Sequence, residues 1–305
     1  MILEEETVAQ MSAADYYRHH GYVVFPALVP HERIDALMAR YRADISPSSS
    51  KFFRQNTNRY ETNVMNPHGH VRQSFLDVHA YDSHPAFQES TLQIYFSPEI
   101  RAALTSITGA TKHNLMQSML FDLNAATPPH QDWWYLDSVP GGGLLAAWIA
   151  LEDIAEDAGR FYVLPASQTT VLHEDGLPHS KWLERVRAHA DTHASAMVAP
   201  ALKKGDVLFW NSRTIHGSYA TIDERRSRKS LTAHYLPSNL VFGNLFTSKP
   251  WVEYRDWQGH HFFANQPEYS RKAELVSRAK QAVYDSPALL RLARRFQKRS
   301  IADVN

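Results

Sequence analysis

The sequence contains no cysteine, and its 32 basic residues are balanced by 32 acidic ones. The missing cysteine excludes disulfide frameworks, thiolate nucleophiles and cysteine-built zinc or iron–sulfur sites. Any metal site must therefore be made from histidine, aspartate or glutamate. The missing net charge excludes a whole-chain positive field of the kind that gathers nucleic acid, so we expect no nucleic-acid partner.

Long apolar runs are also absent. The longest, residues 144–151, is far shorter than the roughly 20 residues that a membrane-spanning helix needs. The first residues, Met1 to Glu6, lack the basic segment that opens a secretory signal. We therefore expect no transmembrane segment and a cytoplasmic protein. Hydrophobic residues make up 44% of the 305, which is enough for a folded domain with a sizeable core.

Hydrophobic patterning predicts one domain over residues 1–305, built in three parts. Residues 8–99 contain a helical layer, with two helices around a short strand, and a polar stretch from Ser46 to His79 that we expect to be a loop. Residues 241–305 regain helical periodicity from Tyr269. Between them, residues 100–240 carry short apolar runs bounded by turn residues, interrupted by one helical insert near Trp182. The apolar runs are 115–123, 144–151, 161–164, 207–210 and 230–235. This spacing is typical of an antiparallel sandwich or barrel.

A metal site without cysteine that serves redox chemistry commonly has two histidines and one carboxylate on one face of Fe(II). Three His-x-Asp pairs are present: His130 with Asp132, His173 with Asp175, and His189 with Asp191. Residues i and i+2 share a face only on extended backbone, which excludes the third pair because it falls on the helical insert. The second pair precedes a turn, and we expect it to be solvated.

The first pair has the context of a ligand pair. Pro128 and Pro129 favour an extended approach to His130, and three aromatic residues follow Asp132. A surface histidine and aspartate at a strand end is the alternative interpretation. The natural distant ligand is His216, which follows a predicted strand in Thr-Ile-His-Gly-Ser. His234 is its rival because it too lies near a strand.

An alternating block runs from Arg228 to Tyr235. On a strand it places Arg228, Ser230, Thr232 and His234 on one face. An arginine facing inward needs an anion, which is either a structural aspartate or glutamate or the carboxylate of a bound molecule.

These residues resemble the phytanoyl-CoA dioxygenase (PhyH-like) family of Fe(II)- and 2-oxoglutarate-dependent oxygenases. The similar blocks are His130-Gln-Asp-Trp-Trp-Tyr, residues 147–168, and His216-Gly-Ser followed by Arg228-Lys-Ser-Leu-Thr-Ala-His-Tyr. With the opening segment around Asp15, the resemblance covers roughly residues 8–240. It implies a mainly β fold with flanking helices and a double-stranded β-helix (jelly-roll, cupin-like) core.

The resemblance also implies roles for individual residues. His130, Asp132 and His216 would bind Fe(II), and Arg228 would hold the distal carboxylate of 2-oxoglutarate. The other residues implied to line the cosubstrate are Ser218, Trp148 and, on the strand before the His-x-Asp pair, Gln117. The arginine follows His216 by twelve residues where the family usually has eleven, and Arg225 and Arg226 are close by, so the choice of Arg228 depends on the alternating block.

The implied activity is that of a dioxygenase which consumes O2 and 2-oxoglutarate, releases succinate and CO2, and hydroxylates or otherwise oxidises an unactivated C–H of a small organic substrate. The retained carboxylate Asp132 argues against halogenation, and desaturation or cyclisation would use the same residues. A non-catalytic jelly-roll protein that binds a metal or ligand is the alternative.

The substrate is the least determined feature. The candidates for contacting it are Trp133, Trp134, Tyr135 and Arg59. The polar stretch from Arg54 to Arg72 either covers a polar, sugar-like ligand or is a solvated loop. Residues 271–299 carry nine basic and two acidic residues, and this tail would contact phosphates, a lipid-linked substrate or a membrane surface, or would simply dock on the sheet.

Overall fold

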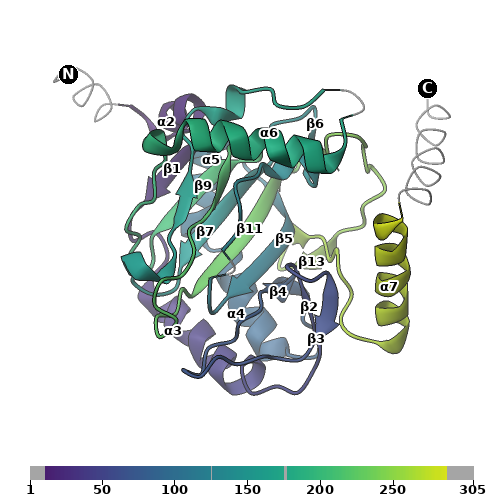
Figure 1. Cartoon of the computed structure of the whole chain (residues 1–305). Coiled ribbons are helices and arrows are strands. Elements are labelled where there is room, and N and C mark those ends of the chain that lie inside the picture. Colours follow the sequence, from purple (N-terminus) through teal and green to yellow (C-terminus); the bar gives the residue numbers. More distant parts are fainter. Residues whose placement is uncertain (1–10, 125, 175–176, 287–305) are drawn as a thin grey trace.

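The computed structural model describes residues 11–124, 126–174 and 177–286, and it shows β layers flanked by helices (Figure 1). The larger layer is one sheet of eight strands in the order β1-β9-β7-β11-β5-β14-β13, with β4 also paired to β5. Its strands are β1 (Tyr22–Phe25), β4 (Phe75–Leu76), β5 (His113–Phe121), β7 (Leu145–Ala150), β9 (Val207–Asn211), β11 (Ser230–Pro237), β13 (Arg255–Trp257) and β14 (His260–Phe262). The pairing is antiparallel throughout except between β14 and β5.

A smaller layer faces this sheet. It consists of short antiparallel pairs, β8 (Phe161–Val163) with β10 (His216–Ser218) and β6 (Asp137–Val139) with β12 (Val241–Gly243). Side chains of β8 pack with those of β7 and β9 in a shared apolar cluster, so the two layers enclose a core between them. The mainly β, double-stranded β-helix prediction is therefore confirmed, and the five apolar runs all fall on strands.

Six helices surround the layers in the described part of the chain. They are α2 (Ala13–His20), α3 (His31–Arg40), α4 (Pro85–Tyr95), α5 (Pro98–Thr108), α6 (His179–Thr192) and α7 (Arg271–Asp285). Figure 1 shows α6 crossing one end of the molecule and α7 at one side of it. The predicted helical insert is α6.

The two faces of β11 have different surroundings. Leu231, Ala233 and Tyr235 belong to the main core, together with Phe87 of α4 and Leu104 of α5. The alternate residues of β11 consequently face the smaller layer, as the alternating sequence predicts. This alternation matters for function because it turns a row of buried polar side chains toward the space between the layers.

Gly21 connects the first helix to the core of the fold. It ends α2 with φ of +75°, and a Cβ at this position would overlap the side chains of Gln168 and Thr214. The Thr214 hydroxyl donates a hydrogen bond to the Gly21 carbonyl at 2.7 Å. Glycine is required here both for its conformation and for the close approach of the segment that precedes His216.

The expectation that residues 46–79 form an unstructured loop is wrong. This segment contains β4 and a hairpin of β2 (Phe52–Arg54) with β3 (Arg59–Glu61). The hairpin is held by Arg54, a fully buried residue whose guanidinium donates to the Ser74 carbonyl at 3.2 Å and to Asn63 Oδ1 at 2.6 Å. Strands of two or three residues leave no periodic signal in the sequence. Arg54 and Asn63, two polar residues of the stretch that we considered as a cover for a ligand, thus form hydrogen bonds with other residues of the chain.

The C-terminal helix α7 docks on this hairpin. Ser270 caps it by accepting a hydrogen bond from Ala273 N, and Glu274 pairs with Lys51 at 3.2 Å. Leu275 is 66% exposed, so α7 buries little of its apolar surface. The rest of the basic tail, residues 287–299, lies outside the described residues. Among the described residues, no helix combines the length and apolar character needed to cross a membrane.

Replacing Trp182 by alanine is expected to destabilise the protein by about 3–5 kcal/mol, because the ring is fully buried and stacks on Trp134 at 4.6 Å. Chemical denaturation measures this change. Arg187→Ala, on the exposed side of α6, is the matched control and should stay within about 0.5 kcal/mol of wild type. A loss below about 1 kcal/mol for Trp182→Ala would show that α6 is not part of the cooperative core.

Stability should fall on acidification partly because of His79. This fully buried ring lies 2.6 Å from Ser118 Oγ and 3.0 Å from the Phe263 carbonyl, and burial lowers its pKa from the ordinary 6.5 to about 4. Below about pH 6.5 His79 therefore binds a proton in the unfolded chain but stays neutral in the folded protein until about pH 4. The free energy of unfolding consequently decreases between these two pH values.

Denaturation with urea at a series of pH values tests this contribution. His79→Gln should show a shallower loss of stability between pH 6.5 and 4.5 than wild type, whereas His68→Gln, at an exposed position, should keep the wild-type dependence. Equal slopes for wild type and His79→Gln would contradict the assignment.

Candidate active site

Two histidines and an aspartate that are distant in the sequence meet at one point of the fold. Gln131 has extended backbone with φ of −122° and ψ of 140°, so His130 and Asp132 lie on the same side of the chain, and Asp132 then begins a short 3-10 turn. His216 opens β10 and exchanges two backbone hydrogen bonds of 3.0 Å with His130. The candidate ligand atoms of the three residues lie within 4.8 Å of one another. The described residues contain no other such group of three or more.

The two imidazoles are oriented by backbone carbonyls. His130 Nδ1 lies 3.0 Å from the Pro128 carbonyl and His216 Nδ1 lies 2.9 Å from the Thr214 carbonyl. A carbonyl only accepts hydrogen bonds, so each Nδ1 carries the proton and each Nε2 presents a lone pair. These Nε2 atoms lie 3.7 and 3.5 Å from Asp132 Oδ1. This is the arrangement of histidine ligands whose tautomer is fixed by an outer hydrogen bond.

The protonation states of His216 and Asp132 suit metal binding. Burial lowers the pKa of His216 to about 4, so its ring is neutral near pH 7. Burial alone raises the pKa of Asp132, but the nearby imidazoles of His216, His234 and His130 more than offset it and hold this pKa well below its usual range. The site therefore offers two imidazole nitrogens and one carboxylate, the donor set of a facial triad.

The remaining oxygen of Asp132 faces the large sheet. Asp132 Oδ2 accepts a hydrogen bond from Trp210 Nε1 at 3.0 Å and lies 3.3 Å from His234 Nε2. His234 thus lies near the candidate ligands without belonging to their group, so its position favours His216 as the distant candidate ligand. The sequence pattern did not predict either contact. Its only signal was that both residues lie on strands flanking the expected site.

Arg228 lies just before β11 and is buried without an anionic partner. It is 2% exposed, its Nε and Nη1 have no hydrogen-bond partner among the described residues, and burial lowers its pKa to about 9. The guanidinium lies 5.5 Å from the Phe121 ring and 5.6 Å from the Trp148 ring. Among the described residues, no aspartate or glutamate forms the structural ion pair that we considered for Arg228.

Further unpartnered polar atoms follow along the same face of β11. They are Ser230 Oγ, Thr232 Oγ1 and His234 Nδ1, all in residues no more than 5% exposed. Buried polar atoms are nearly always hydrogen-bonded, so an unpaired row between Arg228 and the triad indicates a space lined for a polar ligand. Arg225 and Arg226 do not compete for this position, since both are exposed and pair with Asp223 at 2.8 Å and Asp157 at 3.7 Å.

The other predicted cosubstrate residues border the same space. Trp148 of β7 lies opposite Thr232 in the sheet, and Gln117 of β5 lies opposite His234. Ser218, two residues after His216 on β10, accepts a hydrogen bond from Thr127 N at 2.9 Å, which leaves its hydroxyl hydrogen free to donate.

The four predicted substrate residues do not converge. Trp133 and Trp134 are buried with α6 in one apolar cluster. Tyr135 is 43% exposed and its hydroxyl lies 2.7 Å from His179 Nε2, while Arg59 is exposed on β3. The expectation that His173 is solvated is wrong: its ring packs edge-on against Trp134 with centroids 5.7 Å apart. Asp175 lies outside the described residues.

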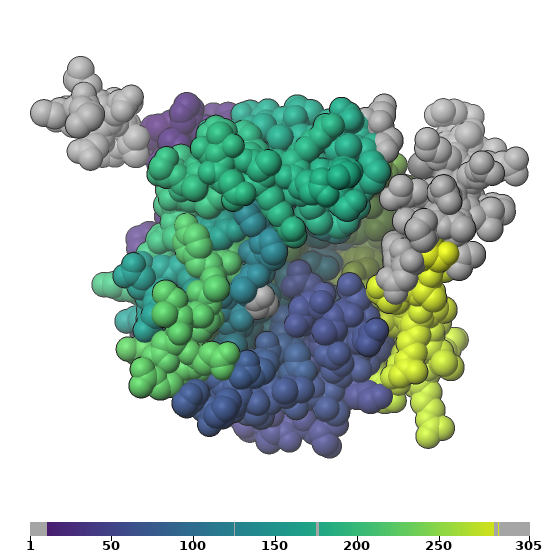
Figure 2. Space-filling model, viewed as in Figure 1, coloured from purple at the N-terminus to yellow at the C-terminus, as the bar shows by residue number. Residues whose placement is uncertain are grey.

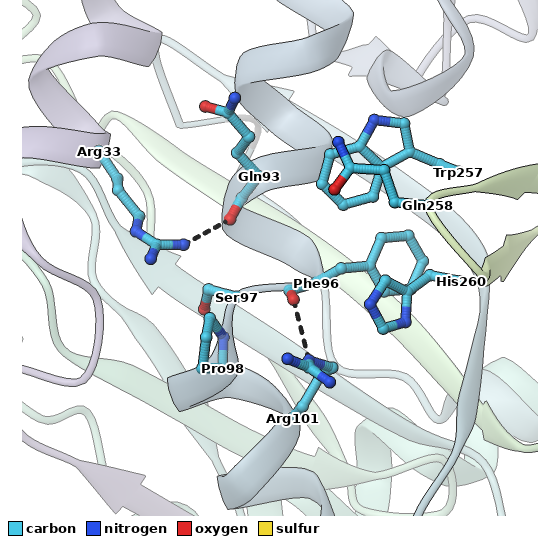
Figure 3. A pocket seen from close by; sticks show the side chains of 9 residues that line it. All are labelled: Arg33, Gln93, Phe96, Ser97, Pro98, Arg101, Trp257, Gln258 and His260. Carbon is cyan, nitrogen blue, oxygen red and sulfur yellow. Dashed lines mark hydrogen bonds between the residues drawn. The ribbon is translucent and has the colours of Figure 1, made fainter.

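Two clefts lie elsewhere on the molecule. One of about 450 Å³ lies between α3, the α4–α5 corner and the β13–β14 hairpin (Figure 3). Its two arginines each donate to a backbone carbonyl, Arg33 to Gln93 at 3.0 Å and Arg101 to Phe96 at 3.1 Å. The other, about 520 Å³, is lined by residues around the β2–β3 hairpin and the segment before α7. Neither cleft is lined by a predicted site residue.

Figure 2 shows a recess between α6 and the β2–β3 hairpin on the face that both figures view.

Two curated proteins resemble this chain in sequence. The bovine (Bos taurus) peroxisomal phytanoyl-CoA dioxygenase is 24% identical over 249 residues, which cover 77% of this chain and 71% of that protein. The mouse (Mus musculus) phytanoyl-CoA dioxygenase domain-containing protein 1 is 25% identical over 187 residues, 58% of this chain and 60% of the relative.

Two solved structures share the fold. EctD from S. alaskensis, solved with 2-oxoglutarate and 5-hydroxyectoine, has a TM-score of 0.56 at 19% identity and covers 84% of each chain. The epimerase SnoN, solved with Fe3+, alpha ketoglutarate and nogalamycin RO, has a TM-score of 0.55 at 20% identity and covers 75% of this chain and 84% of its own.

The phytanoyl-CoA dioxygenase (PhyH) family matches residues 17–229, a range that includes all three triad residues and Arg228. The match includes strands of both β layers and ends just before β11. The chain therefore belongs to the phytanoyl-CoA dioxygenase family of Fe(II)- and 2-oxoglutarate-dependent oxygenases.

Proposed function

We propose that this protein hydroxylates an unactivated C–H of a small organic substrate, with His130, Asp132 and His216 as the Fe(II) ligands. The observation that carries the proposal is that the same fold contains both the His130–Asp132–His216 group and Arg228, a buried arginine with no anionic partner among the described residues. The Nε2 atoms of the two histidines and Asp132 Oδ1 suit a divalent metal. When bound, Fe(II) with 2-oxoglutarate and O2 supplies the oxidising chemistry, with succinate and CO2 as coproducts.

The residues of this chain bind and orient the cosubstrate. Arg228 is proposed to pair with its distal carboxylate, because guanidinium binds carboxylate through two parallel hydrogen bonds. The hydroxyls of Ser218 and Thr232 are donors on the two layers that border the space. The Trp148 ring packs beside the Arg228 guanidinium and excludes water from it. The attraction between the guanidinium and the carboxylate is stronger in such a dry site.

A non-catalytic metal-binding protein on the same fold is less well supported. Such a protein accounts for the triad but not for Arg228, because a buried unpaired guanidinium destabilises the fold unless a bound anion compensates it. We propose a small polar molecule as the substrate class, since the structural relatives above were solved with small organic molecules. The sugar-like and lipid-linked options remain predictions.

Binding of 2-oxoglutarate should depend on Arg228. Under anaerobic conditions, adding Fe(II) and 2-oxoglutarate to wild type should produce the weak visible charge-transfer band of the bidentate complex. Arg228→Ala should weaken 2-oxoglutarate affinity roughly 30-fold or more, the equivalent of about 2 kcal/mol for one lost partner of a buried charge pair. Arg225→Ala, an exposed arginine paired with Asp223, is the control and should bind as wild type does. Equal affinity for the Arg228 variant would remove this residue from its role.

Arg228 should also lower the stability of the ligand-free protein. Arg228→Met replaces an uncompensated buried charge by an apolar side chain of similar length, so the free energy of unfolding should rise by about 1–4 kcal/mol. Denaturation in urea without metal or 2-oxoglutarate measures this change. Arg225→Met should have no comparable effect. A destabilised Arg228→Met variant would mean that the guanidinium contributes packing or hydrogen bonds that outweigh its desolvation.

A further inference from the structure

The carboxylate of Asp132 has two oxygens in different surroundings. Oδ1 faces His130 Nε2 and His216 Nε2, at 3.7 and 3.5 Å. Oδ2 faces away from them and contacts Trp210 Nε1 at 3.0 Å and His234 Nε2 at 3.3 Å. One oxygen is therefore directed at the candidate metal position, and the other is occupied by two nitrogens of the large sheet.

Both nitrogens act as donors. The indole Nε1 of Trp210 is a donor only, and a carboxylate only accepts. His234 Nε2 must therefore carry a hydrogen to bond with Oδ2. In the neutral ring this leaves His234 Nδ1 as a lone pair, and that atom has no partner among the described residues. The imidazole is thus bonded to the chain on one side only, through Asp132.

The two donors are held rigidly. Trp210 lies on β9 and His234 on β11, strands that flank β7 in the middle of the sheet, and both side chains are 2% exposed. The Trp210 ring also packs on the His216 ring, with centroids 4.9 Å apart. A hydrogen-bonded partner on such strands has little freedom to follow Asp132 if that side chain rotates.

We propose that His234, together with Trp210, is a positioning residue that commits Asp132 to bind the metal through Oδ1 alone. The inference rests on the metal site of the proposed function and adds to it the residue that fixes the carboxylate. If Oδ2 were free, the carboxylate would also be able to bind through both oxygens and occupy a position needed by another ligand. His234 does not bind the metal in this arrangement, because its nitrogen contacts the oxygen on the opposite side.

Anaerobic calorimetric titration of the metal-free protein with Mn(II), without 2-oxoglutarate, tests this role. His234→Ala should weaken metal affinity about 10- to 100-fold, the range found when the hydrogen-bond partner of a metal ligand is removed. His234→Gln keeps an N–H donor near Oδ2 and should recover most of the affinity. His113→Ala removes a histidine of the neighbouring strand β5 that bonds to Thr108, and it should bind as wild type does.

A spectroscopic measurement separates positioning from general destabilisation. The visible absorption of the Co(II)-loaded protein reports the number and arrangement of ligands, so it should change in His234→Ala and return toward wild type in His234→Gln. Trp210→Phe should show a smaller change of the same kind because one donor remains. His113→Ala should leave the Co(II) spectrum unchanged even if it lowers stability.

Each outcome of these experiments either supports or overturns the positioning role of His234. Wild-type affinity and an unchanged Co(II) spectrum in His234→Ala would overturn the inference and leave the proposed function intact. Equal weakening by alanine and glutamine would also overturn it, since His234 would then act as a ligand or through packing. If His234→Ala does not fold, the glutamine variant still decides, because only positioning predicts near-normal binding. A wild-type protein that binds no metal would remove the proposed function itself and the inference with it.

Discussion

The buried carboxylate of Asp132 is the interaction on which this structure depends. It lies where the two layers meet: His216 of the smaller layer and the adjacent His130 approach one oxygen, and two donors from the large sheet approach the other. A buried carboxylate without such partners would cost several kcal/mol. The contacts with Trp210, His216 and His234 also join Asp132 to residues 78 to 102 positions away in the chain, so stability and the candidate site share their residues.

Much of the site was predictable because its signals are local. The two prolines before His130 favour an extended approach to it, and alternation along the block from Arg228 to Tyr235 places Arg228 and His234 on one face. Helical periodicity excluded the pair at 189 and 191, which lies on α6. Each of these inferences needs only the period of one element.

Other features depend on contacts that no local pattern encodes. The β2–β3 hairpin is stabilised by Arg54, which reaches carbonyls and an amide up to twenty residues away. The burial of Trp133 and Trp134 under α6 requires knowing where that helix lies, and the two donors to Asp132 Oδ2 require the register of β9 and β11.

The outer edge of β5 is divided between two partners. Near its end, β4 pairs with it at Met119 and Leu120, and near its start, Phe263 N donates to the Leu115 carbonyl at 2.8 Å. A polypeptide shortened before the β13–β14 hairpin would leave the first half of this edge with open hydrogen-bonding groups. Such an edge is a template for strand exchange with a second molecule. The β13–β14 hairpin therefore covers an edge that would otherwise be open to strand pairing with a second molecule.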